Sequence, residues 1–147
     1  MSINFNKYET FNFYPLSKNR KRYSEGGLRI KSEFKQSLPN RPLITIITAV
    51  FNGEKYLQET INSIKNQTYN NYEFVVIDGG STDKTMEIIK KNSNMIDYWV
   101  SEEDEGLYDA FNKGLSLARG DYIGIINSDD TYENNALEIL TNYIIKN

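Results

Sequence analysis

One stretch decides the fold of this chain: Tyr122-Ile123-Gly124-Ile125-Ile126-Asn127-Ser128-Asp129-Asp130. A short β-branched run that ends abruptly in carboxylates indicates a buried parallel strand that delivers acids to its carboxyl end. In open α/β sheets, ligands bind at that edge. Adjacent acids are costly there unless a positive group shares the site, and the usual one is a divalent cation that carries phosphates. The stretch therefore predicts an α/β fold with a metal- and phosphate-binding edge.

Upstream of this stretch, strand and helix patterns alternate. Runs rich in β-branched and aromatic residues predict strands over residues 43–50, 73–77, 96–100 and 122–126. Apolar residues at helical spacing predict helices over 57–66, around Met86 and Ile89, over 107–118 and over 137–144. Elements of these lengths in this order predict a Rossmann-like parallel sheet with flanking helices on both faces.

Residues 1–40 do not share this pattern. Asn, Lys, Ser and aromatic residues alternate there without periodicity, and Gly26-Gly27 and Pro39-Asn40-Arg41-Pro42 interrupt the segment. We predict a basic, aromatic N-terminal extension over residues 1–40 and one domain over residues 41–147. The aromatic residues favour a segment that packs on something over a free tail: Phe5, Tyr8, Phe11, Phe13 and Tyr14.

Positive charge is concentrated in the N-terminal part of the chain. Residues 1–42 carry nine Lys and Arg against three Asp and Glu, whereas residues 43–147 carry eight against seventeen. The basic run Lys18-Asn19-Arg20-Lys21-Arg22 is a candidate for contact with an anionic membrane surface or nucleic acid. The favoured interpretation is a solvated extension, so we expect no nucleic-acid partner and keep peripheral membrane contact as the alternative.

The residue types that the chain lacks exclude several kinds of chemistry. Its 147 residues include no cysteine and no histidine, which excludes disulfides, thiolate and imidazole metal ligands, and His-based acid–base catalysis. Any catalysis must use carboxylates, hydroxyls, Lys, Arg or a bound metal. No apolar run approaches the roughly 18 residues that cross a bilayer, and the N-terminus lacks the apolar region of a signal peptide. We therefore expect a cytoplasmic protein.

Two strand ends upstream carry candidate binding residues. Phe51 follows the first strand, in Thr48-Ala49-Val50-Phe51-Asn52-Gly53-Glu54, where its ring can lie under a planar base. The alternative is a core Phe before an ordinary turn. Asp78 follows the second strand and can accept a hydrogen bond from a base or from ribose hydroxyls. Asp83 stands at the start of a helix, where capping is its expected role.

An acidic segment precedes the third predicted helix, in Ser101-Glu102-Glu103-Asp104-Glu105-Gly106-Leu107-Tyr108-Asp109. Acids at this position suit the helix macrodipole, which accounts for the three glutamates. Asp104 and Asp109 bracket Gly106, where a ligand can approach the backbone closely. For these two aspartates we weigh a ligand-binding role and a scaffold role equally.

The last segment, Asn127-Ser128-Asp129-Asp130, offers carboxylates to a divalent ion. Mg²⁺ and Mn²⁺ bind carboxylate oxygens and keep positions open for phosphate. In sugar transfer from a sugar nucleotide the leaving group is a diphosphate, whose charge such a metal neutralises as a Lewis acid. The candidate nucleotide-binding residues are Ala49, Phe51, Asp78, Asp104, Asp109, Asn127 and Ser128, and the candidate metal ligands are Asp129 and Asp130.

Several segments resemble the family 2 glycosyltransferases. Residues 46–57, Gln67-Thr68-Tyr69 and Val76-Ile77-Asp78-Gly79-Gly80-Ser81-Thr82-Asp83 look like the opening of that family. Its colanic-acid-type branch is resembled by Asp104-Glu105-Gly106-Leu107-Tyr108-Asp109-Ala110-Phe111-Asn112-Lys113-Gly114 and Asn127-Ser128-Asp129-Asp130. The similarity covers about residues 41–140. It implies a GT-A fold, in which a Rossmann-like nucleotide-binding half precedes an acceptor half.

The resemblance also implies an activity and roles for single residues. The family transfers sugars from nucleoside diphosphate donors, here a UDP-sugar, with inversion and a divalent metal, to a glycan or lipid-linked acceptor in cell-surface polysaccharide synthesis. Phe51 would stack on the base, Asp78 would bond the base edge, and Asp129 would belong to the DxD metal motif. That motif begins with Asn127 here, and an amide is a weaker metal ligand than a carboxylate.

The family's catalytic base belongs to the acceptor half, so the resemblance implies that the base lies beyond Asn147, the last residue of this chain. No catalytic residue is therefore expected within the chain. Residues 41–147 would form a donor-binding region, truncated before the acceptor half and inactive by itself. The alternative is a non-catalytic nucleotide-sugar-binding module that is complete at 147 residues, and the mass of the native protein separates the two. A nicotinamide-dependent oxidoreductase is disfavoured, since no G-x-G-x-x-G follows the first strand.

Overall fold

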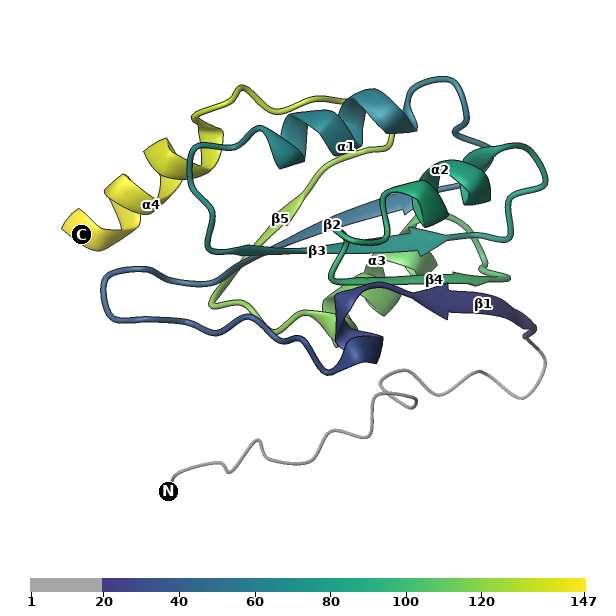
Figure 1. The fold of residues 1–147 in the computed structure, drawn as a ribbon, viewed down its shortest axis with the longest axis horizontal. Coiled ribbons are helices and arrows are strands. Elements are labelled where there is room, and N and C mark those ends of the chain that lie inside the picture. The colour runs from purple at the N-terminus through teal and green to yellow at the C-terminus, as the bar shows by residue number, and fades with distance from the viewer. Residues whose placement is uncertain (1–19) are drawn as a thin grey trace.

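The computed structural model describes residues 20–147, which form one sheet between helical layers (Figure 1). The sheet has the strand order β1-β4-β3-β2-β5. Its strands are β1 (Arg22–Gly26), β2 (Ile44–Val50), β3 (Tyr72–Asp78), β4 (Tyr98–Glu102) and β5 (Tyr122–Ile125). Strands β2 to β5 run parallel, and β1 pairs antiparallel with β4. The predicted α/β class is confirmed, with one antiparallel strand added.

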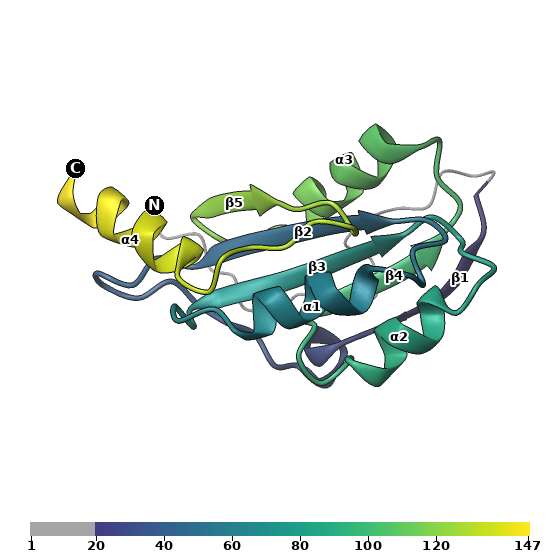
Figure 2. The ribbon, with the colours of Figure 1, turned by 90° about the horizontal axis from the view of Figure 1, so that it is seen from above.

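The described residues also form four α-helices and a short 3-10 helix: η1 (Leu28–Lys31), α1 (Leu57–Lys65), α2 (Thr85–Lys91), α3 (Leu107–Leu117) and α4 (Ala136–Lys146). Figure 2 shows α1 and α2 on one face of the sheet and α3 on the other. Each face has its own apolar core, centred on Phe74 and Ile61 under α1 and on Val75 and Ala110 under α3. Within residues 20–147, none of the helices has the length and apolarity that crossing a membrane requires.

The order of the strands creates a switch point beside β2. The chain moves from β2 to β3 to β4 in one direction and then places β5 on the opposite side of β2. The segments that follow β2 and β5 therefore diverge at the carboxyl edge of the sheet. Ligands of open α/β sheets bind in the crevice that forms at such a point.

Strand β5 is an edge strand and lies open to solvent. The side chains of Tyr122, Ile123 and Ile125 are between 42% and 46% exposed. The sequence predicts a buried strand here, and that part of the prediction is wrong. An apolar run can form an edge strand as well as a buried one. Here β5 is exposed because no further element of the described chain packs on it.

Residues 22–26 form a strand of the sheet. The sheet therefore includes residues from before residue 40, where the sequence predicts the end of the N-terminal extension. Strand β1 pairs with β4 from Arg22 opposite Glu102 to Gly26 opposite Trp99. At Gly27, φ is 103°, and a Cβ atom there would lie 2.7 Å from the Ile96 carbonyl oxygen. Only glycine fits this turn. The aromatic residues between Phe5 and Tyr14, and the start of the basic run, lie outside the described residues.

The helix η1 that follows places a charged side chain in the interior. Arg29 and Glu73 pair at 2.8 Å, and each side chain is 2% exposed. Arg29 also donates to the carbonyl of Leu117, and Thr45 donates to Glu73 at 2.6 Å. These neighbouring groups offset part of the cost of burying the ion pair, while Arg29 Nε has no hydrogen-bond partner among the described residues.

Candidate functional site

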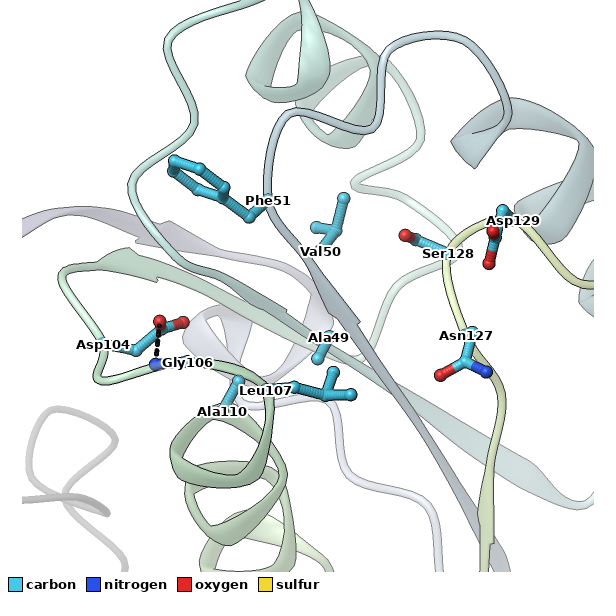
Figure 3. Close-up of a pocket in the computed structure, with 10 residues that line it drawn as sticks. All are labelled: Ala49, Val50, Phe51, Asp104, Gly106, Leu107, Ala110, Asn127, Ser128 and Asp129. Atoms are coloured by element: carbon cyan, nitrogen blue, oxygen red, sulfur yellow. Dashed lines mark hydrogen bonds between the residues drawn. The ribbon is translucent and has the colours of Figure 1, made fainter.

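A pocket of about 370 Å³ lies at the switch point, within the size range of small-ligand sites. Figure 3 shows Phe51 and Asp104 on one side of it and Asn127 and Asp129 on the opposite side. The N-terminal end of α3 forms its floor. Three separate segments meet here, which supply Ala49, Val50 and Phe51, then Asp104, Gly106, Leu107 and Ala110, and finally Asn127, Ser128 and Asp129.

The structure brings six of the predicted site residues together and leaves three outside. Ala49, Phe51, Asp104, Asn127, Ser128 and Asp129 line the pocket, whereas Asp78, Asp109 and Asp130 do not. Strand-end reasoning finds the six because the carboxyl ends of parallel strands meet at one edge. The pocket also has lining residues that the sequence does not single out, and they are apolar: Val50, Leu107 and Ala110.

Phe51 is an exposed aromatic residue and not part of the core. Its side chain is 64% exposed, directly after β2. The backbone around it is fixed by Asn52, whose amide N–H donates to Ser81 Oγ at 2.7 Å and whose Oδ1 accepts from the Thr82 amide at 2.8 Å. The ring is thus presented from a loop that is tied to the loop after β3. Such a ring can stack on a planar group.

Asp78 is fully buried and organises the loop that follows it. Its carboxylate accepts from the Gly80 and Ser81 amides, both at 3.1 Å, and from the hydroxyl of Ser81. A fourth bond comes from Ser101 Oγ at 2.6 Å, at the end of β4. The carboxylate therefore joins the ends of two neighbouring strands. Its predicted contact with a base edge stays a prediction.

Asp104 is the carboxylate that reaches the pocket from the loop before α3. Its Oδ1 accepts from the Gly106 amide at 2.9 Å, the bond drawn in Figure 3. A Cβ atom on Gly79 would lie 2.6 Å from Asp104 Oδ2. A side chain at residue 79 would displace the Asp104 carboxylate, so the loop after β3 lies in contact with the loop after β4.

Asp109 is engaged in ion pairs. It pairs with Arg20 at 2.5 Å and with Lys113 at 3.7 Å, and it accepts from the Glu105 amide at 3.1 Å. Partial burial raises the pKa of Asp109, but the hydrogen bonds from Arg20 and the Glu105 amide outweigh it and hold the pKa below its usual value. These contacts are those of a scaffold residue, and a ligand-binding role for Asp109 has no support in this geometry.

Lys113 and Glu102 form a buried pair beneath this loop. They lie 3.0 Å apart, and both side chains are at most 1% exposed. Lys113 also donates to the carbonyl of Glu103 at 2.8 Å. The sequence assigns Glu102 to the helix macrodipole, and burial against Lys113 corrects that interpretation. The only signal in the sequence is a Lys placed four residues after Asp109.

The segment after β5 forms a turn that is anchored to α1. Asn127 Nδ2 donates to Asp130 Oδ2 at 3.0 Å, and Thr60 Oγ1 donates to the Asp130 carbonyl at 2.7 Å. The turn therefore directs Asp129, and not Asp130, to the pocket. The predicted use of Asp130 as a metal ligand has no support in this geometry.

The last residue of the chain, Asn147, lies away from the pocket. It follows α4, and its Nδ2 donates to the Tyr143 carbonyl at 2.9 Å, so its side chain only closes the end of that helix. Asn147 does not line the pocket, and Figure 1 shows the C-terminus beyond the end of the sheet opposite to the carboxyl ends of β2 and β3. A catalytic base beyond Asn147 stays a prediction, and a segment that supplied it would have to return across the sheet to reach the pocket.

The oxygen atoms at the pocket suit a cation that takes most of its ligands from a bound substrate and from water. Across residues 20–147, no group of three or more Asp and Glu side chains is arranged to hold a metal ion. Mg²⁺ and Mn²⁺ are often bound by one or two carboxylates, with substrate phosphates and water as the other ligands. Asp129, which lines the same side of the pocket as Asn127, fits that arrangement.

Comparison with known sequences gives one family. The family described as "Glycosyl transferase family 2" matches residues 45–147. An uncharacterized glycosyltransferase of Haemophilus influenzae is 43% identical over 114 residues, which are 74% of this chain and 44% of that relative. The chain thus spans less than half the length of this relative.

Comparison with solved structures gives enzymes of the GT-A fold. TarS of S. aureus, in complex with UDP-GlcNAc, has a TM-score of 0.64 and 28% identity over 70% of this chain and 31% of that one. The mannosyltransferase PcManGT from Pyrobaculum calidifontis, in complex with GDP-Man and Mn²⁺, has a TM-score of 0.62 and 25% identity over 80% of this chain and 36% of that one.

Proposed function

This chain belongs to glycosyl transferase family 2, and we propose that it is the donor-binding region of an inverting enzyme that uses a UDP-sugar. The observation that carries the proposal is the pocket at the switch point, which has an exposed aromatic ring at one side and a carboxylate at the other. Those two ends suit the base and the diphosphate of one ligand.

Each pocket residue has a proposed part in holding the donor. Phe51 stacks on the uracil ring, and Asp129, with Asn127, holds a divalent cation against the diphosphate. Asp104 lies on the same side of the pocket as Phe51 and is available to ribose hydroxyls as a hydrogen-bond acceptor. When bound, the cation neutralises the charge that develops on the leaving diphosphate. The UDP-GlcNAc complex of TarS supports the choice of uridine, whereas the GDP-Man complex of PcManGT makes guanosine the competitor to test.

The acceptor side of the proposal follows from the family resemblance. We propose a glycan or lipid-linked acceptor in cell-surface polysaccharide synthesis, at the inner face of the membrane. The acceptor hydroxyl needs a base within hydrogen-bond reach, roughly 3 Å. The pocket carboxylates are poor candidates, because Asp129 is assigned to the cation and Asp104 accepts from the Gly106 amide. We therefore expect the 147-residue chain to transfer no sugar by itself, and robust turnover of labelled UDP-sugars with an acceptor panel would contradict this.

Metal-dependent binding tests the donor assignment. UDP is titrated by calorimetry with Mn²⁺ and again with EDTA, and GDP is titrated under the same conditions. We expect tighter binding of UDP with Mn²⁺, and equal affinities in both conditions would refute the metal assignment. Asp129→Ala should cost about 1–3 kcal/mol of binding, as for a lost interaction with a charged group. Glu87→Ala, an exposed substitution on α2, is the matched control.

Two substitutions test the residues proposed to contact the nucleobase, Phe51 and Asp78. Phe51→Ala should weaken UDP by roughly 1–3 kcal/mol through lost stacking, whereas Tyr143→Ala, similarly exposed on α4, should not. Asp78→Asn should alter the ratio of uridine to cytidine diphosphate affinity, because an acceptor becomes a group that also donates. Ser101→Ala removes one bond to the same carboxylate and serves as its control. If neither change affects UDP binding in a folded protein, the two residues are scaffold.

A further inference from the structure

Strand β1 and the residue before it contact the loops after β3 and β4, and the loop after β4 lines the pocket. The Glu103 amide donates to the Lys21 carbonyl at 3.1 Å, and the Tyr23 hydroxyl donates to Glu103 Oε1 at 3.1 Å. The Tyr23 ring lies against the loop after β3, since a Cβ atom on Gly80 would be 3.0 Å from it. Residues that lie before the family match at 45–147 therefore brace the candidate site.

Arg20 bridges two carboxylates, Glu105 before and Asp109 after Gly106. Its Nη1 lies 2.5 Å from Asp109 Oδ2, and its Nη2 lies 2.9 Å from Glu105 Oε1. The side chains of Arg20 and Asp109 are only 15% and 18% exposed, so water screens their attraction less than that of an open surface pair. A guanidinium can hold both carboxylates in a fixed geometry, which an ammonium cannot do.

The bridge leads to the pocket through a single turn of the backbone. Asp109 Oδ2, held by Arg20, accepts from the Glu105 amide at 3.1 Å. The next amide, that of Gly106, donates to Asp104 Oδ1 at 2.9 Å. Asp104 is the one residue of this relay that lines the pocket with its carboxylate. Arg20 itself does not line the pocket, so any effect on a ligand passes through this turn.

We propose that Arg20 is a positioning residue that fixes the Glu105-Gly106 turn and so presents Asp104 to the nucleotide. The inference rests on the proposed function, in which Asp104 faces a nucleoside diphosphate. No signal in the sequence indicates it, since Arg20 belongs to a basic run that resembles a solvated extension.

The binding test uses the 147-residue chain and UDP with Mn²⁺. Arg20→Gln should weaken UDP about fivefold to tenfold, a typical size for coupling between separate sites. Arg20→Lys should fall in between, because it keeps the charge without the bridge. Arg41→Gln, which removes a surface arginine bound to Asn70, should bind as the unchanged protein does. Equal affinities of Arg20→Gln and Arg41→Gln would overturn the proposal.

A double substitution separates positioning from a general loss of stability. If Arg20 acts through Asp104, adding Arg20→Gln to Asp104→Asn should cause no further loss of UDP affinity. Losses that add in full would overturn the proposal. A thermal unfolding midpoint of Arg20→Gln close to that of Arg41→Gln would confirm that the fold is intact.

Amide exchange without nucleotide distinguishes failure of this inference from failure of the proposed function. In Arg20→Gln, the amides of Glu105 and Gly106 should exchange faster. The Gly79 amide, bonded to the Val50 carbonyl at 2.9 Å, should not change and is the internal reference. If the unchanged protein binds no UDP, the proposed function is wrong. Unchanged protection of Glu105 and Gly106 in Arg20→Gln overturns the positioning role in either case.

Discussion

The two edges of the sheet differ in the side chains that they carry: charged pairs on the β1 side and exposed apolar residues on β5. On the β1 side, charged side chains pair with buried partners: Arg22 with Glu102 on β4 at 3.0 Å, and Arg29, just after β1, with Glu73 on β3. At the β5 edge, the strand Tyr122–Ile125 carries no charged residue, and its three side chains are all nearly half exposed. An exposed apolar edge is prone to pair with other strands. Charge thus closes one edge, and the other is left for apolar contact.

The pocket lies between these edges and takes one wall from each side. The wall with Asp104 is supported by the ion pair of Arg20 with Asp109 and, from β1, by that of Arg22 with Glu102. The wall with Asp129 follows the open strand β5 and is held to α1 by the bond from Thr60. We expect substitutions at the β1 edge to destabilise the protein and substitutions on β5 to change its association instead.

The largest effect should come from breaking the buried ion pair. Arg29→Met removes the cation beside the buried Glu73, which keeps the Thr45 hydroxyl and the Arg119 amide as donors. Removing one partner of such a pair costs roughly 3–5 kcal/mol. The free energy of unfolding, measured in urea at neutral pH, should fall by that amount.

The double substitution Arg29→Met with Glu73→Gln is its control. Replacing both partners removes the uncompensated charge, so much of the lost stability should return. A single Arg29→Met protein as stable as the unchanged one would show that charge does not close the β1 edge.

The turn after β1 should be the next most sensitive position. Gly27→Ala forces a side chain into a φ of 103° and towards the Ile96 carbonyl oxygen. Strain in this backbone region costs on the order of 1–3 kcal/mol. Urea denaturation measures the loss of unfolding free energy. Gly120→Ala is unsuitable as a control, because a Cβ atom there would also lie too close to the backbone of Thr45. Gly106→Ala is a better one, since φ there is 105° and no atom lies within 4 Å of its Cβ position. If the two cost the same, the strain is in the backbone and not in the contact with the Ile96 carbonyl.

A smaller effect should appear in acid. The folded pKa of Asp109 lies below its usual value of 3.8, so its contribution to stability is present above that pH and is lost as pH falls through the lowered value. Arg20→Gln removes a cause of the depression. The difference in unfolding free energy between the two proteins should therefore shrink from about pH 6 to about pH 3. A constant difference would mean that Arg20 stabilises the edge without acting on Asp109.

The smallest effect on stability should come from the open edge. Ile123→Lys places a charge on a half-exposed position of β5, and we expect the free energy of unfolding to change by no more than about 0.5 kcal/mol. The same change should lower self-association, because a charge on an edge strand opposes strand pairing. Sedimentation at increasing concentration measures this. A large loss of stability would show that β5 is closed by contacts like those of β1.

The sequence predicts one of these edges better than the other. The alternation of strands and helices identifies β2 to β5, and the strand ends place Phe51, Asp104 and Asp129 in one pocket. The sequence does not predict strand β1, Arg-Tyr-Ser-Glu-Gly, because charge pairing, and not an alternation of apolar residues, holds this strand in place.

Buried charges are the main reason that the rest could not be predicted. In a sequence, Arg29 and Lys113 have the same signature as solvated residues, and only the fold supplies their partners. Asp78 lies at a strand end, where a ligand-binding residue is expected. Its carboxylate oxygens instead accept hydrogen bonds from nearby hydroxyls and amides. A single apolar run also cannot tell an edge strand from a buried one, which is why β5 is more open than predicted.

The position of β1 has a practical consequence for anyone who trims this protein. The family match begins at residue 45, and a chain shortened to that boundary would lose Arg22, Gly27 and Arg29 together. It would uncover the hydrogen-bonding edge of β4 and leave Glu73 without its cation. A recombinant version should therefore start no later than Arg20, whatever the boundaries of the recognised family suggest.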